Sequence, residues 1–217
     1  TFIVDNRYQI FLKGFETTLI ITVCAAIIGI VLGTLVAIGK VYHIQSGRLK
    51  FVDKILSLYL TIFRGTPIVV QLLIWAFVVF ASVNNEVPVA IFAFGINSGA
   101  YVAEIVRAGI LAVDKGQTEA GRSLGLSGGA TMRYIVLPQA IRHILPALSN
   151  EAIALLKETS VVGYIAVTDI TKAADLVRAR TFDALFPLLF VALVYLLLVV
   201  LLTFLQRRLE RRMQLRD

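Results

Sequence analysis

The chain has 217 residues, of which 58% are hydrophobic, and its mean hydropathy is +0.84. No soluble domain of this size needs so much apolar content, whereas membrane spans do, so the composition excludes an ordinary soluble fold. The formal net charge of +7 does not indicate nucleic-acid binding, because the basic residues flank apolar runs and form no stripe interleaved with aromatic side chains.

Five apolar runs predict an all-α integral membrane protein surrounded by lipid, with a single transmembrane domain over residues 1–217. An α-helix needs about 20 apolar residues to cross the hydrocarbon core, and each run is long enough. The predicted spans cover approximately residues 17–39, 55–82, 89–113, 146–168 and 184–205. No internal repeat or low-complexity linker divides the chain.

The first predicted span holds a GxxxG pattern, Gly29 and Gly33, which lets another helix pack closely. The span also contains the single cysteine, Cys24, which excludes an intrachain disulfide and fits no zinc site. We therefore predict close helix packing here and no metal site.

The second predicted span is interrupted by the sequence Arg64-Gly65-Thr66-Pro67. Arg64 lies about nine residues into the span, or roughly 14 Å along a helix, which is near the middle of a bilayer. Proline lacks a backbone donor and disfavours helix in the residue before it, so the helix is weakened here. A broken helix at this depth frees backbone groups with which transporters bind substrate. The alternative is a proline kink with Arg64 paired to an acidic neighbour.

Polar side chains follow one face of the third predicted span. Asn97, Tyr101 and Glu104 are spaced i, i+4 and i+7, and Gly95 and Gly99 form a second GxxxG beside them. An ionisable residue at membrane depth is costly and indicates a pathway or a buried pair. Asn97, Ser98 and Tyr101 therefore either line a cavity or have a structural role, and Glu104 either faces that cavity or pairs only with Arg107.

A polar loop over about residues 114–145 separates the third and fourth predicted spans. Thr118 can cap a short helix, with Glu119 favoured at its positive end and Gly125 suited to a left-handed stop. Because this helix has few bulky apolar residues, lipid is a poorer host for it than a partner protein. We predict that a partner contacts Glu119, Ala120, Gly121, Arg122, Ser123, Leu124 and Gly125.

The fourth predicted span carries four polar residues on neighbouring faces. Glu151 and Glu158 share one face, and Asn150 and Lys157 share the next. Adjacent opposite charges without water are costly, so at least one of Lys157 and Glu158 should face a cavity or a partner. The fifth predicted span has almost no polar atoms, and the tail over residues 206–217 holds five arginines.

Basic residues predict the orientation of the chain. Five spans place residues 40–54, residues 114–145 and the tail on one side, and these segments hold 13 of the 21 Lys and Arg. The positive-inside rule therefore predicts an outside N-terminus, a cytoplasmic C-terminus and a cytoplasmic loop over residues 114–145.

The polar loop resembles the EAA loop of ABC-importer permeases of the MetI-like type. That pattern is Glu-Ala-Ala, three residues, Gly, nine residues, Ile, any residue, Leu-Pro. Here Glu119-Ala120-Gly121 is followed at the same spacings by Gly125, Ile135, Leu137 and Pro138. Only Gly121 departs from the pattern, and it lowers helix propensity by roughly 1 kcal/mol relative to alanine. In that family the short helix is the coupling helix, which sits in a cleft of a cytoplasmic ATPase.

Three further segments resemble the polar amino-acid branch of these permeases, which includes histidine, arginine and glutamine transporters. They are Phe63-Arg64-Gly65-Thr66-Pro67 followed by Val70-Gln71, then Ala100 to Ile105, and then Leu156 to Ser160, where Glu158 replaces an aspartate. The resemblance implies the transmembrane subunit of an ATP-driven importer in a prokaryotic plasma membrane, which is no enzyme itself.

The same resemblance implies the partners. They are a cytoplasmic ABC ATPase dimer, a second permease subunit, most simply an identical one, and a periplasmic or surface-held substrate-binding protein. We expect no cofactor in this chain, because it has no Walker A motif, and ATP and Mg would belong to the ATPase.

We predict a substrate site that draws on three of the spans. Helix-end amides near Gly65 and Thr66 would take the substrate's carboxylate, and Asn97, Ser98 or Thr159 its ammonium. The full set is Arg64, Gly65, Thr66, Asn97, Ser98, Tyr101, Glu104, Lys157, Glu158 and Thr159.

The charges in the spans favour a basic substrate. Three glutamates, Glu104, Glu151 and Glu158, face three bases, Arg64, Arg107 and Lys157. If Glu104 pairs with Arg107, a glutamate left unpaired at low dielectric attracts a cation. We therefore expect arginine, lysine or histidine to be preferred over glutamine, and both over glutamate.

Two other functions compete with import. A membrane-embedded enzyme would use Glu104, Glu158 or His143, but the chain has neither an HExxH motif nor a nucleophile elbow. A passive channel would have no use for the coupling loop. Co-purification with an ATPase separates import from both.

Overall fold

The computed structural model of the protein describes residues 7–214, and these are entirely helical apart from short connections. Residues 1–6 and 215–217 lie outside the described residues. Two parts of the predicted topology fall on them, the N-terminus predicted to be outside and the last arginine of the tail, Arg216. The α-helices are α1 (Tyr8–Ser46), α2 (Lys50–Gly65), α3 (Ile68–Ile74), α4 (Glu86–Leu111), α5 (Lys115–Ser123), α6 (Gly128–Thr131), α7 (Leu137–Glu158), α8 (Ile170–Thr181) and α9 (Leu185–Gln214). Two π-helical segments, η2 (Trp75–Val79) and η3 (Met132–Val136), and one 3-10 helix, η4 (Thr159–Ile165), complete the described part of the chain.

Within residues 7–214, three helices are long and apolar enough to cross a membrane, namely α1, α4 and α9. α2 together with α3 and η2 forms a fourth candidate that is bent by 108°. The all-helical class is confirmed. The fourth predicted span falls on α7 and η4, which are not among these candidates because α7 carries Arg142, Glu151, Lys157 and Glu158.

The predicted interruption of the second span is confirmed, because Thr66 and Pro67 adopt extended backbone between α2 and α3. The predicted boundaries of the fourth span differ from those of the helices. α7 begins at Leu137 and not near Pro146, since Pro138 occupies its first turn, where no backbone donor is needed, and Pro146 lies inside it. The α-helix also stops at Glu158, and residues 159–165 form the 3-10 helix η4.

α1 and α4 form the most extensive helix pair, and their glycines explain it. A Cβ atom on Gly33 would lie 2.6 Å from Cβ of Val102, and one on Gly95 would lie 2.7 Å from a side-chain carbon of Ile28. Both predicted GxxxG patterns therefore lie at the contact between these two helices, which can approach closely because the glycines have no side chains.

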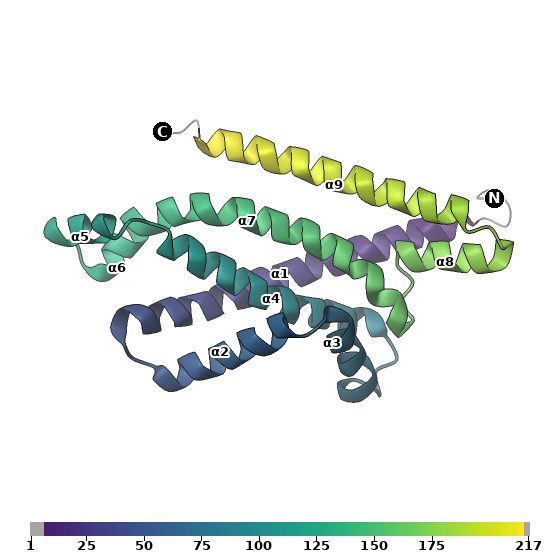
Figure 1. The fold of residues 1–217 in the computed structure, drawn as a ribbon, viewed down its shortest axis with the longest axis horizontal. Helices are drawn as coiled ribbons and strands as arrows, with labels where there is room; N and C mark the ends of the chain where they lie inside the picture. Colours follow the sequence, from purple (N-terminus) through teal and green to yellow (C-terminus); the bar gives the residue numbers. More distant parts are fainter. Residues whose placement is uncertain (1–6, 215–217) are drawn as a thin grey trace.

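Several connections and short helices lie at the two ends of the molecule. In Figure 1 the α1–α2 connection, α5, α6 and the last turns of α9 lie at one end of the long axis, whereas α8 and the start of α1 lie at the other. Three segments predicted to share one side of the membrane thus lie at the same end. Most large apolar side chains of α9 are exposed, as expected for a helix in lipid.

A buried carboxylate joins α8 to α1 at the end opposite to α5. Asp169 caps α8, because its two oxygens accept from the backbone N–H groups of Thr171 and Lys172 at 3.1 and 2.8 Å. The N–H of Ile170 donates to Thr18 Oγ1 of α1 at 3.2 Å. Burial raises the pKa of the Asp169 carboxyl above its usual range, against the opposing effect of the hydrogen bonds from α8.

Candidate functional site

The break between α2 and α3 is closed by two side-chain amides. Pro67 has no N–H, so the Phe63 carbonyl four residues earlier has no helical donor. Gln71 Nε2 donates to that carbonyl at 2.9 Å and to the Thr66 carbonyl at 3.1 Å. Asn97 Nδ2 on α4 donates to the Phe63 carbonyl at 2.9 Å and to Gln71 Oε1 at 3.0 Å. We call Phe63, Gln71 and Asn97 the amide node; both amide side chains are buried.

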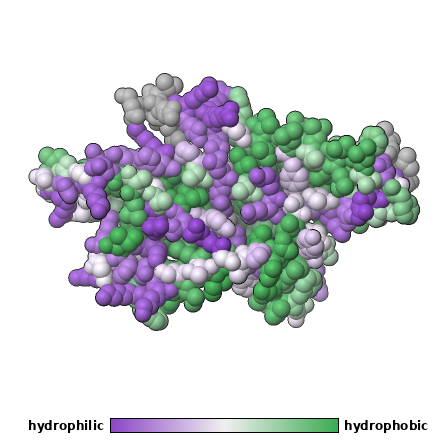
Figure 2. All heavy atoms as spheres, in the orientation of Figure 1, coloured by the Kyte–Doolittle hydropathy of each residue, from purple (hydrophilic) through white to green (hydrophobic). Residues whose placement is uncertain are grey.

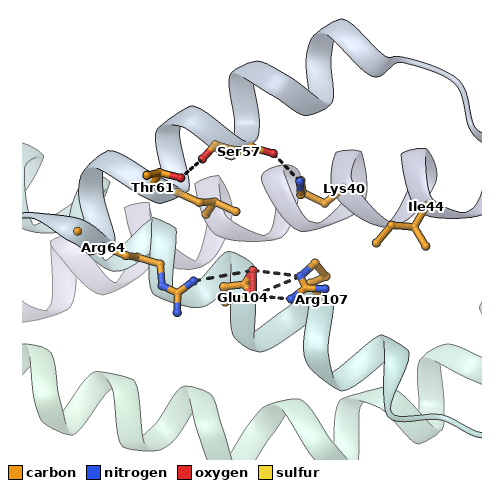
Figure 3. Close-up of a pocket in the computed structure, with 9 residues that line it drawn as sticks. Lys40, Ile44, Ser57, Thr61, Arg64, Glu104 and Arg107 are labelled. Atoms are coloured by element: carbon orange, nitrogen blue, oxygen red, sulfur yellow. Dashed lines mark hydrogen bonds and ion pairs between the residues drawn. The ribbon is translucent and has the colours of Figure 1, made fainter.

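Beside the amide node, a cavity of about 530 Å³ opens between α1, α2 and α4 (Figure 3). Arg64, the residue after Phe63, extends into it from α2, and Glu104 and Arg107 face it from α4. We call these three residues the charge cluster. The complete lining is Lys40, Ile44, Ser57, Leu60, Thr61, Arg64, Gly65, Glu104 and Arg107.

The pairing within the charge cluster is uneven. Arg107 binds Glu104 through two nitrogens, with Nη2 2.7 Å from Oε2 and Nε 3.0 Å from Oε1. Arg64 Nη1 lies 3.9 Å from Glu104 Oε1, which is beyond hydrogen-bond distance. The Arg64 guanidinium also lies 5.7 Å from the centre of the Tyr101 ring, a cation–π contact. Glu104 is thus held by Arg107 and only loosely by Arg64.

A second ion pair forms the rim of the cavity. Lys40 Nζ on α1 lies 2.7 Å from Asp53 Oδ1 on α2 and donates to Ser57 Oγ at 2.7 Å. Lys40, Ser57 and Thr61 were not predicted from the sequence, because each lies on a helix whose neighbours the sequence does not reveal. The hydroxyl residues Ser57 and Thr61 follow each other at i, i+4 on one face of α2, a signal that could have placed them beside Arg64.

The structure brings four of the predicted substrate residues together, namely Arg64, Gly65, Tyr101 and Glu104. Asn97, Ser98 and Thr159 are instead buried, and their side chains donate to groups of the protein, not to a cavity. The predicted carboxylate-binding amides near Gly65 and Thr66 stay a prediction: these two residues lie at the carboxyl end of α2, where carbonyls are free, and the N-terminal amides of α3 begin at Ile68. The Thr66 hydroxyl donates to the Ile62 carbonyl at 2.8 Å.

The glutamates of α7 lie outside this cavity. Ser98 Oγ on α4 donates to Glu151 Oε1 at 2.8 Å. Among the described residues, no cationic group lies within 4.0 Å of Glu151 or Glu158. Lys157 is exposed, whereas Leu155 and Leu156 beside it are buried.

The predicted partner-binding helix corresponds to α5, which begins earlier than expected. Asp114 caps it by accepting from the Gly116 N–H at 2.7 Å, so Thr118 lies inside the helix and is not the cap. Gly125 has φ +82°, the predicted left-handed stop. Glu119, Ala120, Arg122, Ser123 and Leu124 are exposed, and Leu124 is 80% exposed. α5 therefore presents a continuous face at one end of the molecule (Figure 1).

Gly121 is the one buried residue of α5, which explains its departure from the EAA pattern. A Cβ atom at this position would lie 2.7 Å from Thr131 Cγ2 of α6 and 2.9 Å from Ile135 Cδ1 of η3. Since η3 continues directly into α7, the packing at Gly121 connects α5 to the helix that carries Glu151 and Glu158.

Comparison with known proteins gives consistent matches. The profile of a family described as "Binding-protein-dependent transport system inner membrane component" matches residues 29–215. The chain is 40% identical over 181 residues to the putative glutamine transport system permease protein GlnP of Rickettsia prowazekii, covering 82% of this chain and 81% of that protein. It is also 40% identical to the arginine transport system permease protein ArtQ of Bacillus subtilis, with 82% and 80% covered. The L-cystine transport system permease protein TcyB of the same organism is 36% identical, with 83% and 76% covered.

Solved structures match over almost the whole chain. A crystal structure of an amino acid ABC transporter with histidines superposes with a TM-score of 0.88 at 38% identity, covering 98% of both chains. An inward-facing conformation of the MetNI methionine ABC transporter superposes with a TM-score of 0.81 at 20% identity, covering 97% of this chain and 99% of that one. The second match supports the fold alone.

Proposed function

The chain belongs to the family of binding-protein-dependent transport system inner membrane components, and we propose that it forms the membrane path of an ATP-driven importer of a polar amino acid. Members of this family are transport subunits and not enzymes, and ATP is hydrolysed by a separate subunit. The observation that carries the proposal is the exposed face of α5, which matches the EAA pattern and lies at one end of the helices.

The topology we propose has five spans: α1, the bent α2–α3–η2 path, α4, α7 with η4, and α9. The clustering of α5, the α1–α2 connection and the end of α9 at one end supports a shared cytoplasmic side. The polar residues of α7 fit a span that faces other helices or a partner subunit, because lipid contact would be costly for them. N-terminus outside and C-terminus in the cytoplasm complete this proposal.

Coupling would run from α5 into α7. Docking of α5 in the ATPase would move α6 and η3 with it, since Gly121 is packed against Thr131 and Ile135. η3 leads without interruption into α7, so a rigid shift at the ATPase tilts the helix that carries Glu151. ATP-driven closure of the ATPase dimer would in this way switch the access of the path between the two sides, after a binding protein has delivered the amino acid.

A basic amino acid is the substrate that the charges favour. Glu104 already has Arg107 as its partner, whereas Glu151 accepts only from the Ser98 hydroxyl among the described residues. A carboxylate at low dielectric gains from a cationic side chain such as that of arginine, lysine or histidine. Glutamine is the second candidate, because a relative at 40% identity is named for its transport.

Transport in proteoliposomes tests this function. The complex of permease, cognate ATPase and binding protein should accumulate radiolabelled arginine with ATP, with lysine and histidine competing more strongly than glutamine, and glutamate least. Because the binding protein can select substrates by itself, stimulation of ATP hydrolysis should also be measured without it. Equal stimulation by arginine and glutamate would overturn the basic preference, and stimulation by no amino acid would overturn amino-acid import.

Two variants test whether α7 causes the preference for a basic amino acid. Glu151→Gln should reduce the advantage of arginine over glutamine in that ATPase assay, because the carboxylate that attracts the cation is gone. Glu16→Gln, which removes an exposed carboxylate from α1, should leave the advantage unchanged.

A further inference from the structure

The cavity beside the α2 break has an excess of positive charge. Within residues 7–214, three cationic side chains line it, Lys40, Arg64 and Arg107, against the single carboxylate of Glu104. The two glutamates of α7 lie elsewhere and have no cation within 4.0 Å in the same part of the chain. The net charge of the cavity lining is therefore opposite in sign to the two α7 glutamates, although the spans as a whole carry balanced charges.

Among the described residues, only one of the three cations in the cavity has no close acceptor for its charge. Arg107 donates twice to Glu104, and Lys40 is 2.7 Å from Asp53. Arg64 lies 3.9 Å from Glu104, and 42% of its side chain is exposed. Its guanidinium rests near the Tyr101 ring, which orients it but leaves its N–H groups available.

Lipid is a poor occupant for this surface. Figure 2 shows hydrophobic residues over α3 and much of α9, whereas hydrophilic residues gather at the end that holds α5 and α6 and extend into the middle of the same face. A cavity of about 530 Å³ lies within the size range of small-ligand sites, roughly 300–1,000 Å³. A small polar solute fits its chemistry better than an acyl chain.

We propose that this cavity binds the zwitterionic head group of the transported amino acid, with Arg64 receiving the α-carboxylate and Glu104 the α-ammonium. The inference rests on the proposed function and deepens it. A planar guanidinium donates two parallel hydrogen bonds to a carboxylate, which Arg64 does not yet do in this structure. The Arg64–Glu104 gap of 3.9 Å places opposite charges side by side, as a zwitterion requires.

A site for the head group does not depend on the side chain of the substrate. The head-group site and the α7 glutamates would therefore bind different parts of the substrate, the first its head group and the second its charged side chain. Arg107 has a positioning role, because it fixes the Glu104 carboxylate beside Arg64 through two hydrogen bonds.

Competition with an amino acid that lacks its carboxylate tests the proposal. Binding of radiolabelled L-arginine to the purified permease–ATPase complex, without binding protein, would be competed with unlabelled arginine or with its decarboxylated amine. The wild-type complex should prefer arginine by roughly 10- to 100-fold, the effect of one hydrogen-bonded charged group. Arg64→Gln should bring that ratio close to one, and Arg64→Lys should restore part of it.

Lys54→Gln is the matched control, since it removes an exposed positive charge from the same helix outside the cavity. It should keep the wild-type ratio, and co-elution with the ATPase should show that each variant is assembled. An unchanged ratio in Arg64→Gln, or a wild-type complex that does not distinguish the two compounds, would overturn the head-group site alone. A wild-type complex that binds no amino acid would instead overturn the proposed function.

Discussion

The two sides of the α2 break are built from neighbouring residues but differ in almost every physical respect. On one side the amide node joins the Phe63 carbonyl to Gln71 and Asn97 with neutral, buried hydrogen bonds. On the other side the charge cluster, which starts one residue later at Arg64, is partly exposed and lines a cavity. Polar residues within spans thus lie in two different settings, one that closes the broken helix and one that lines a cavity.

The largest expected effect follows from breaking the amide node. Gln71→Leu removes the Gln71 partner of the Thr66 carbonyl and of one N–H of the buried Asn97 amide. A buried polar group without a partner costs about 1–3 kcal/mol, so the thermal unfolding temperature in detergent should fall clearly. Gln45→Leu, an exposed substitution of the same type on α1, should unfold at the wild-type temperature. Wild-type stability of Gln71→Leu would contradict the structural role of the node.

Removing the charge cluster's carboxylate should act on binding and not on stability. Glu104→Gln keeps the shape of the side chain but removes the partner of Arg107 and the receptor proposed for the α-ammonium. Affinity for arginine should fall roughly tenfold, because a hydrogen bond to a charged group is lost. Stability should change by less than about 1 kcal/mol, as for other partly exposed pairs. A fall in unfolding temperature as large as that of Gln71→Leu would erase the distinction between the two sides.

The smallest expected effect concerns the orientation of Arg64. Tyr101→Leu removes the ring beside the guanidinium, a contact of roughly 0.5–1 kcal/mol at an exposed site, so affinity should fall about two- to fivefold. Equilibrium binding of arginine to the purified complex measures it. Tyr42→Leu, on an exposed part of α1, is the control. A loss as large as that of Arg64→Gln would mean that Tyr101 itself contacts the substrate.

The sequence predicts the position of the helix break well, because proline and glycine act locally. It also predicts the α1–α4 contact through two GxxxG patterns and the left-handed Gly125. Local sequence patterns could not decide whether Asn97 and Ser98 line a cavity. A spacing of i, i+4 places residues on one helix face but does not identify the neighbouring helix, and here the partners are Gln71 and Glu151.

For the charge cluster, too, the sequence predicts contacts between near neighbours in the chain but not contacts between distant residues. The Glu104–Arg107 pair follows from local spacing and is confirmed. The approach of Lys40 and Ser57 depends on how α1 packs on α2, which no local pattern specifies. Similarly, the buried environment of Gly121 arises from α6 and η3, so the sequence shows only a departure from a pattern and not its cause.

The central claim is that α5 couples an ATPase to transport, and one glycine tests it most directly. Gly125→Asp alters the left-handed end of the helix, where φ is +82°. Gly47→Asp is a matched control, because Gly47 also has positive φ and has open space within 4 Å of where a Cβ atom would stand. Gly47 belongs to the α1–α2 connection, which lies at the same end of the molecule as α5 (Figure 1). Substrate-stimulated ATP hydrolysis should be measured for both variants in proteoliposomes with equal amounts of inserted protein. We predict that Gly125→Asp falls to the basal rate while Gly47→Asp stays near wild type; full stimulation in Gly125→Asp would contradict coupling through α5.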